Sequence, residues 1–349
     1  MSLIKLLRKR NRKLLFTTPS HSQKFFIFNK FRQFYKYDIS ETDAHNPQEA
    51  LENAEKRAAN IYGTINTHFL TNGSTSGIIA AVLSCSKQGD KVLIWENAHP
   101  CHENAVKLAG ATPVYYKLPF SKDWGVPCKT TPELIDIKGI KAVIVTSPTY
   151  EGIVSDIKEL KRVCEKNKAY LIVDEAHGAL YPFSEKLPQS AVNIADFTIQ
   201  SLHKTAGGLN PTALLHVNCN LSAKEALSMI NTTSPSYPLL ASIEANINYL
   251  NSAKGKKKIF DLIKNIEDIK NSVNTVEFGG DDITKILIKH KKLTGYKLSE
   301  KLFEEFNVED EKTNAVSTML LCGVGTDENK LKRLKHCLLY TSDAADDKA

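Results

Sequence analysis

Several signals that define common protein classes are missing from this chain of 349 residues. Its seven cysteines include no Cys-x-x-Cys pair, so neither a typical zinc site nor a thioredoxin-type redox motif is predicted. No run of about 18 apolar residues occurs, and we therefore expect no membrane-spanning segment. No repeat with a period of roughly 20 to 50 residues is visible, which argues against a solenoid or a propeller.

The excess of positive charge is concentrated at the start of the chain. Lysine and arginine total 46 and aspartate and glutamate 39, which gives a net charge of +7. Most of this excess comes from basic residues without an acidic neighbour: Lys5, Arg8, Lys9, Arg10, Arg12 and Lys13. The rest of the chain is nearly neutral and does not predict the broad basic surface of a nucleic-acid-binding protein.

Residues 1–45 are interpreted as an N-terminal arm. Charges interrupt the apolar residues of positions 1–16, so the continuous apolar stretch of a signal peptide is missing. Such a basic stretch is typical of a solvated or partner-packing arm, and a helix on a membrane surface is the alternative. Scattered single cysteines fit a reducing compartment, so we expect a cytoplasmic protein without a membrane or nucleic-acid partner.

The middle of the chain alternates short apolar runs with helical patterns. Several runs are nearly continuous in Val, Ile and Leu, which is typical of strands that are buried on both faces. Strands are expected at residues 91–95, 113–118, 141–146, 170–174, 197–200 and 213–217, and helices at residues 75–86, 102–109 and 157–167. This order predicts an α/β fold with a mostly parallel sheet flanked by helices. Ligands of such sheets bind beyond the carboxyl ends of the strands.

From Pro238 onward the pattern changes to that of a smaller α+β unit. Helices are expected at residues 239–251, 256–272, 296–306 and 327–339, and strands at residues 285–289 and 317–322. We therefore divide the chain into the arm, a large domain at residues 46–237 and a small C-terminal domain at residues 238–339. Residues 340–349 are small and acidic, show no periodicity and are assigned no structure.

A polar segment with the sequence TNGSTSG, Thr71–Gly77, opens the first predicted helix of the large domain. Its glycines permit close approach, its hydroxyls donate hydrogen bonds, and free N–H groups at a helix start attract an anion such as phosphate. The same residues would also serve as a plain helix cap. No Gly-Lys-Ser/Thr sequence follows, which excludes a P-loop.

Two further segments place ionisable side chains at the ends of predicted strands. Asp174 opens the sequence Asp-Glu-Ala-His, and a carboxylate at the end of a buried strand is costly without a cationic partner. Desolvation would lower the pKa of Lys204 and make it a candidate for Schiff-base formation. Taken singly, the aspartate could cap a turn and the lysine could be a surface charge. The Asp-Glu-Ala-His sequence is not that of a helicase, because no P-loop accompanies it.

Together, the three segments meet the requirements of pyridoxal 5′-phosphate. The phosphate needs an anion site, the aldehyde needs a lysine, and the pyridine nitrogen needs an acid that keeps it protonated. Asp174 and Lys204 are separated by about one strand–helix–strand step, so we expect them on nearby strand ends at opposite ends of one small ring. The three segments in this order indicate a pyridoxal-phosphate site more strongly than any one of them does alone.

Seven stretches also carry a resemblance to a known family: THFLTNGSTSG from Thr67, GDKVLIWENAH from Gly89, SPTYEGIVSDI from Ser147, VDEAHGA from Val173, QSLHKT from Gln200, ALLHV from Ala213 and TSPSYPLLASIEA from Thr233. In these stretches the chain resembles the pyridoxal-phosphate-dependent ornithine/lysine/arginine decarboxylases of the short bacterial type. The resemblance covers residues 17–336 and implies a fold-type-I enzyme, like aspartate aminotransferase. The family continues with a proline-rich segment and a C-terminal region, which this chain is expected to lack.

The resemblance implies roles for individual residues. Lys204 would form the Schiff base with the cofactor, Asp174 would pair with the pyridine nitrogen, and His99 would stack on the ring. The other implied cofactor-binding residues are Ser74, Thr75 and Ser76 at the phosphate, Ser201 and His203 beside them, Ala176 on the opposite ring face and His177 next to it. No metal is implied.

The implied reaction is the decarboxylation of a basic amino acid, arginine, lysine or ornithine, to a polyamine-type amine and carbon dioxide. The family builds its active sites at a dimer interface, so a homodimer or larger oligomer is implied, with Ser234–Tyr237 reaching the partner's cofactor. Transamination, elimination and aldol cleavage stay open, because the side-chain pocket is not readable beyond a candidate carboxylate at Glu151. A non-catalytic cofactor-binding relative is a further alternative, since residues 206–211 depart from the family pattern.

Overall fold

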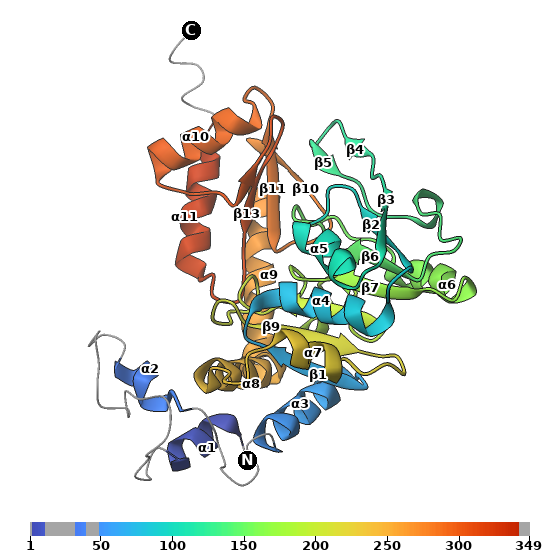
Figure 1. Ribbon diagram of the computed structural model, residues 1–349. Coiled ribbons are helices and arrows are strands. Elements are labelled where there is room, and N and C mark those ends of the chain that lie inside the picture. Colours follow the sequence, from blue (N-terminus) through green and yellow to red (C-terminus); the bar gives the residue numbers. More distant parts are fainter. Residues whose placement is uncertain (1, 11–31, 40–48, 342–349) are drawn as a thin grey trace.

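Two β-sheets organise the chain in the computed structural model, which describes residues 2–10, 32–39 and 49–341 (Figure 1). Within these residues the larger sheet has seven strands in the order β1-β9-β8-β7-β6-β2-β3. In chain order they are β1 (Asn66–Leu70), β2 (Lys91–Trp95), β3 (Thr112–Tyr116), β6 (Ala142–Thr146), β7 (Tyr170–Asp174), β8 (Phe197–Ser201) and β9 (Ala213–Val217). The strand β9 pairs antiparallel with both β1 and β8, and all other pairs in this sheet are parallel. The predicted α/β fold with a mostly parallel sheet is confirmed.

The central strands owe their position to their composition. The sequences of β6, β7 and β8 are AVIVT, YLIVD and FTIQS, and nearly all of these residues are buried. A strand that is covered on both faces needs apolar side chains on both, which explains the unbroken apolar runs of β6 and β7. In β8 the buried polar residues Thr198 and Gln200 are hydrogen-bonded to protein groups. Asp174 stands at the carboxyl end of β7, where the sheet opens to a cavity.

Helices cover both faces of the larger sheet. One face is covered by α4 (Gly73–Cys85), α5 (Pro100–Leu108) and α7 (Lys224–Ile230), and the other by α6 (Ile157–Lys166). The first group shares a core with Ile94, Ile144 and Ile172, whereas α6 packs with Val143 and Val173. Alternate residues of each central strand therefore point to opposite cores, as the pleat of a strand requires.

A third group of helices packs at the β1–β9 end of the larger sheet. It consists of α1 (Leu3–Arg10), α2 (Arg32–Tyr37), α3 (Glu49–Tyr62) and α8 (Tyr237–Asn251). Leu3 and Leu7 of α1 are fully buried, and the backbone N–H of Leu3 donates a 2.6 Å hydrogen bond to Glu244 of α8. The beginning of the predicted arm thus packs on the body of the protein, whereas Arg12 and Lys13 lie outside the described residues.

The smaller sheet has four antiparallel strands in the described part of the chain, in the order β10-β11-β13-β12. Its elements are β10 (Val276–Gly279), β11 (Lys285–His290), β12 (Lys312–Thr313) and β13 (Thr318–Leu321), with helices α9 (Ala253–Ser272), α10 (Gly295–Phe306) and α11 (Glu328–Leu339). Ile286 and Ile288 face these helices. Leu287 and Met319 contact Val126 in the hairpin of β4 (Phe120–Ser121) and β5 (Val126–Pro127). The predicted α+β character is confirmed.

Helix α9 belongs to two cores. Ile259 and Ile263 pack with α8 and the larger sheet, while Leu262 and Ile266 pack with the smaller sheet. A single amphipathic helix therefore joins the two sheets. The predicted domain boundary between residues 237 and 238 stays a prediction.

Several elements were not predicted from the sequence. β1 was missed because its sequence, NTHFL, holds only two strongly apolar residues, and α3 because it buries small alanines rather than large side chains. Two 3₁₀ turns, η2 (Pro132–Leu134) and η3 (Tyr181–Phe183), complete the described elements. Among the described residues, the structure contains no helix with the length and apolarity that a bilayer crossing requires. The tail prediction falls mostly on residues 342–349, outside the described part.

Candidate active site

Asp174 and Lys204 lie at the carboxyl ends of adjacent parallel strands. Asp174 is the last residue of β7, and Lys204 stands in the turn that follows β8. The two strands are hydrogen-bonded neighbours, so their ends open to the same edge of the sheet. Both side chains line one cavity of about 770 Å³. The structure thus brings together two residues that are 30 positions apart in the sequence.

Asp174 is a buried carboxylate with a histidine partner. Its Oδ2 accepts a 2.8 Å hydrogen bond from Nε2 of His102, and its Oδ1 accepts one of 3.1 Å from the backbone N–H of Ala176. Burial alone would raise the pKa of Asp174, but the hydrogen bond and charge of His102, together with Lys204, lower it to about 2. The carboxylate is therefore ionised at neutral pH and suited to hold a proton on a ring nitrogen that faces it.

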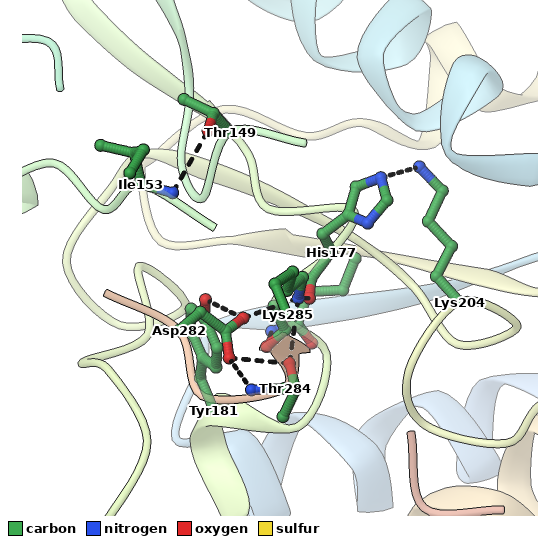
Figure 2. Close-up of polar contacts among 10 residues, drawn as sticks. Thr149, Ile153, His177, Tyr181, Lys204, Asp282, Thr284 and Lys285 are labelled. Carbon is green, nitrogen blue, oxygen red and sulfur yellow. Dashed lines mark hydrogen bonds and ion pairs between the residues drawn. The ribbon is translucent and has the colours of Figure 1, made fainter. Parts of the chain in front are cut away.

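Lys204 contacts a second histidine. Its Nζ lies 2.9 Å from Nε2 of His177, and Figure 2 shows the two side chains pointing toward each other. Burial lowers the pKa of Lys204, while the charge of Asp174 partly opposes this effect. Burial and the nearby Lys204 charge also hold the pKa of His177 well below its usual value, so the ring is neutral and accepts the hydrogen bond. The lysine amine is thus held by an uncharged acceptor.

The N-terminus of α4 forms one wall of the same cavity. Gly73 has a φ of +83°, a conformation that favours glycine, and the helix begins there. The preceding Asn72 makes no side-chain hydrogen bond to the helix, so its side chain does not cap the first N–H groups. Ser74 and Thr75 line the cavity at this point. The start of this 13-residue helix, with its hydroxyl side chains, is suited to bind an anion.

His99 and Ala176 supply further cavity wall. His99 caps α5, with its Nδ1 accepting a 3.3 Å hydrogen bond from the backbone N–H of Cys101 and with Pro100 in the first turn of the helix. Burial lowers the pKa of His99, so its ring is neutral at physiological pH and suited to stack on a planar ligand. Ala176 is 5% exposed and has no side chain beyond its methyl group.

The residues predicted from the sequence divide into two groups. Eight of them line the cavity: Ser74, Thr75, His99, Asp174, Ala176, His177, His203 and Lys204. Ser76 is instead buried, and its hydroxyl donates a 2.8 Å hydrogen bond to the carbonyl of Gly73 within the first turn of α4. Ser201 is fully buried at the end of β8, and its hydroxyl has no hydrogen-bond partner among the described residues. Roles in cofactor binding stay predictions for all ten.

Two neighbours of these residues, His102 and Tyr150, were not recognised as parts of the site. His102 was predicted only as the start of a helix, although His99 and His102 share the first turn of α5. Tyr150 packs on the ring of His177 with 4.6 Å between ring centroids. Glu151 had been considered for a side-chain pocket; it lines the cavity and pairs at 2.6 Å with Lys312. The missed contacts join residues that are distant in the sequence, so no local pattern reveals them.

Comparisons of the sequence with known proteins point to one family. The family model described as "Orn/Lys/Arg decarboxylase, major domain" matches residues 3–297. The uncharacterized protein YaaO of Bacillus subtilis is 30% identical over 280 residues, which cover 75% of this chain and 58% of YaaO. The arginine decarboxylase of Bacillus anthracis is 28% identical over 361 residues, which cover 93% of this chain and 73% of that protein.

Solved structures agree in fold. The constitutive lysine decarboxylase of E. coli superposes with a TM-score of 0.82 at 19% identity, over 96% of this chain and 59% of that one. The lysine decarboxylase of Francisella novicida gives the same TM-score at 20% identity. This chain therefore spans less than two thirds of the length of YaaO and of these two solved decarboxylases.

Proposed function

The chain belongs to the Orn/Lys/Arg decarboxylase family, and from that premise we propose that it catalyses the pyridoxal-phosphate-dependent decarboxylation of a basic amino acid. One observation carries the proposal: Lys204, the ionised Asp174 and the start of α4 line a single cavity. An amine, an acid and an anion site are the three groups that this cofactor requires.

The residues present fit pyridoxal 5′-phosphate, the cofactor on which enzymes of this family depend. The N-terminus of α4, with Ser74 and Thr75, suits the phosphate. The buried hydroxyl of Ser201, at the end of β8, has no hydrogen-bond partner in the described part of the chain. Asp174 suits a protonated pyridine nitrogen, and Lys204 suits the aldehyde. When bound, the cofactor supplies an electron sink for the electron pair that departing carbon dioxide leaves behind.

The protein's own side chains prepare the site for this chemistry. The lowered pKa of Lys204 increases the neutral, nucleophilic fraction of its amine. Asp174 keeps its negative charge in a buried position because His102 and Ala176 donate hydrogen bonds to it, so it would hold a proton on a ring nitrogen that faces it. His99 and Ala176 line the cavity, where they would cover the two faces of a planar ligand and shield it from water.

A basic amino acid is the proposed substrate. The name of the arginine decarboxylase relative from Bacillus anthracis supports this class. Glu151 supports it independently, because it places a buried carboxylate, 6% exposed, in the cavity wall. A guanidinium or ammonium group of the substrate would pair with such a carboxylate.

The assay of carbon dioxide release from ornithine and from each proteinogenic amino acid tests the proposal. We expect release from arginine, lysine or ornithine, and a visible absorption band of lysine-bound cofactor that borohydride abolishes. Lys204→Ala is the control and should lose both the band and the activity. A protein that shows the band but releases no carbon dioxide from any amino acid would contradict the proposed reaction while preserving the cofactor site.

We further propose a homodimer that works in the cytoplasm and supplies diamine or agmatine for polyamine biosynthesis. The segment Ser234–Tyr237 would approach the partner's cofactor. Support comes from an apolar surface at the start of α8, where Ile4, Phe34 and Pro238 line an open hollow. Light scattering on the purified protein should give twice the mass of 38.8 kDa that one chain has, and a monomer at micromolar concentration would contradict this assembly.

A further inference from the structure

A fully buried ion pair lies between the two sheets. Lys285, the first residue of β11, and Asp282 have no exposed surface, and Nζ of Lys285 lies 2.6 Å from Oδ2 of Asp282. Tyr181 donates a 2.7 Å hydrogen bond to the same oxygen. Thr284 donates to the other carboxylate oxygen through both its backbone N–H and its hydroxyl. Every oxygen of the carboxylate is therefore occupied by donors.

Lys285 also contacts a residue of the candidate active site. Its Nζ donates a 2.6 Å hydrogen bond to the backbone carbonyl of His177, a residue 108 positions away. Figure 2 shows Lys285 beneath the backbone of His177, whose ring extends from the other side toward Lys204. The ammonium group thus binds the main chain of the residue whose ring holds the lysine amine.

The segment before Lys285 also binds the loop that carries Tyr150, the aromatic residue that packs on His177. The backbone N–H groups of Asp281 and Asp282 donate hydrogen bonds of 3.0 and 3.1 Å to the carbonyl of Gly152. Gly152 has a φ of +89°, and a Cβ there would meet the Cβ of Lys285 at 3.0 Å. The loop that carries Tyr150, which packs on His177, is therefore docked on the same segment.

Stability alone does not explain a buried pair of this kind. Removing two charges from water costs several kcal/mol per ion, and a well-packed apolar pair is often as stable or more so. The pair does fix relative positions, because the ammonium group of Lys285 donates hydrogen bonds to three oxygen atoms. Two of these oxygens belong to the small-sheet segment, on Asp282 and Thr284, and the third is the His177 carbonyl.

We propose that Lys285 and Asp282 are positioning residues that set the place of the His177 ring and, through it, of the Lys204 amine. The proposal rests on the proposed function only in assigning Lys204 as the cofactor-binding amine. The pair joins the smaller sheet to the reactive edge of the larger one, so a displacement of the smaller sheet changes the contact that Lys204 makes.

The double variant Lys285→Met/Asp282→Asn tests the proposal. It removes both buried charges at nearly constant volume, so no unpaired ion remains, and it leaves the His177 carbonyl without its donor. The matched control is Lys335→Met/Asp268→Asn, which makes the same changes in an exposed pair of 2.8 Å. The primary readout is the NMR signal of the His177 ring in cofactor-free protein, labelled with ¹³C at Cε1 and assigned through its loss in His177→Gln.

We expect the His177 signal to shift or split in the double variant and to stay in place in the control. In the same proteins, the rate at which added pyridoxal 5′-phosphate forms the visible band should fall about tenfold in the double variant only. A merely structural role would lower the unfolding temperature and leave the signal and the rate unchanged, and that result would overturn the proposal.

A milder variant covers the case in which the double variant does not fold. Tyr181→Phe removes one donor to Asp282, and we expect a smaller shift of the His177 signal in the same direction. An unchanged signal in folded Tyr181→Phe would then overturn the proposal. If wild-type protein forms no visible band, the proposed cofactor function fails, but the His177 signal still decides whether Lys285 and Asp282 position the ring.

Discussion

Asp174 and Asp282 are two buried aspartates whose surroundings differ in one respect. Asp282 has no exposed surface, and each of its oxygens accepts two hydrogen bonds, from Lys285 and Tyr181 on one oxygen and from Thr284 on the other. Its capacity as an acceptor is therefore filled by protein groups. A carboxylate in this state fixes the chain around it and has nothing left to offer a ligand.

Asp174 retains capacity that Asp282 has used. In the described part of the chain its oxygens accept one hydrogen bond each, from His102 and from the backbone of Ala176, and the side chain borders the cavity. A carboxylate has about four lone-pair positions, so room for a further donor remains on the cavity side. Both aspartates are buried and charged, so unfilled acceptor capacity is the property that distinguishes the proposed ligand-binding aspartate from the proposed positioning one.

Exchange of each aspartate for asparagine should separate the two roles most strongly. Asp174→Asn keeps the size of the side chain but removes the charge that faces the ligand, so carbon dioxide release should fall about a thousandfold, while the free energy of unfolding at neutral pH falls by no more than about 2 kcal/mol. Asp282→Asn should reduce release only about tenfold, because it acts through His177. Steady-state release and thermal unfolding of both variants check this. Equal losses of activity would erase the distinction.

Truncation of each aspartate to alanine should affect stability in the opposite order, with the larger loss at Asp282. Asp282→Ala leaves the ammonium of Lys285 buried without a counter-charge, and we expect a loss of about 3–5 kcal/mol in the free energy of unfolding. Asp174→Ala leaves only His102 and a backbone N–H unpaired, for a loss of about 1–2 kcal/mol. Urea unfolding at neutral pH measures both. Asp268→Ala in an exposed pair is the control, with a change below about 1 kcal/mol.

Acid should reveal the charge on Asp174. Its pKa is about 2 in the folded protein and 3.8 ordinarily, so the folded state gains stability above pH 4 that is lost as the pH falls through 2. The shift corresponds to about 2 kcal/mol. His102→Phe removes the donor that lowers this pKa, and the variant should therefore lose less stability than wild type between pH 6 and pH 3. Urea unfolding at these two pH values measures it, and parallel losses would contradict the assignment.

The sequence predicts those site residues that stand at the end of a recognisable strand pattern. Asp174 and Lys204 each end a run of buried strand residues, and the order of strands and helices places such ends at one edge. His102 and Lys285 escaped prediction because their partners lie 72 and 108 residues away. Ser76 illustrates the opposite error, since in the first helical turn its hydroxyl bonds back to Gly73 instead of facing the cavity.

The smallest expected effect concerns a third carboxylate, Glu151, which lies between the two cases. It borders the cavity like Asp174 but pairs with Lys312, whose side chain is about half exposed. If acceptor capacity decides the role, Lys312 competes with a cationic substrate for this carboxylate.

Glu151→Gln should then raise KM for the basic substrate about threefold with kcat unchanged, and Lys312→Met should lower KM by a similar factor. Steady-state kinetics with both variants measures the effect, and a neutral amino acid serves as the control substrate. Because the two variants must shift KM in opposite directions, a rise in both would show that the pair only braces the cavity wall, as the filled carboxylate of Asp282 braces its own surroundings.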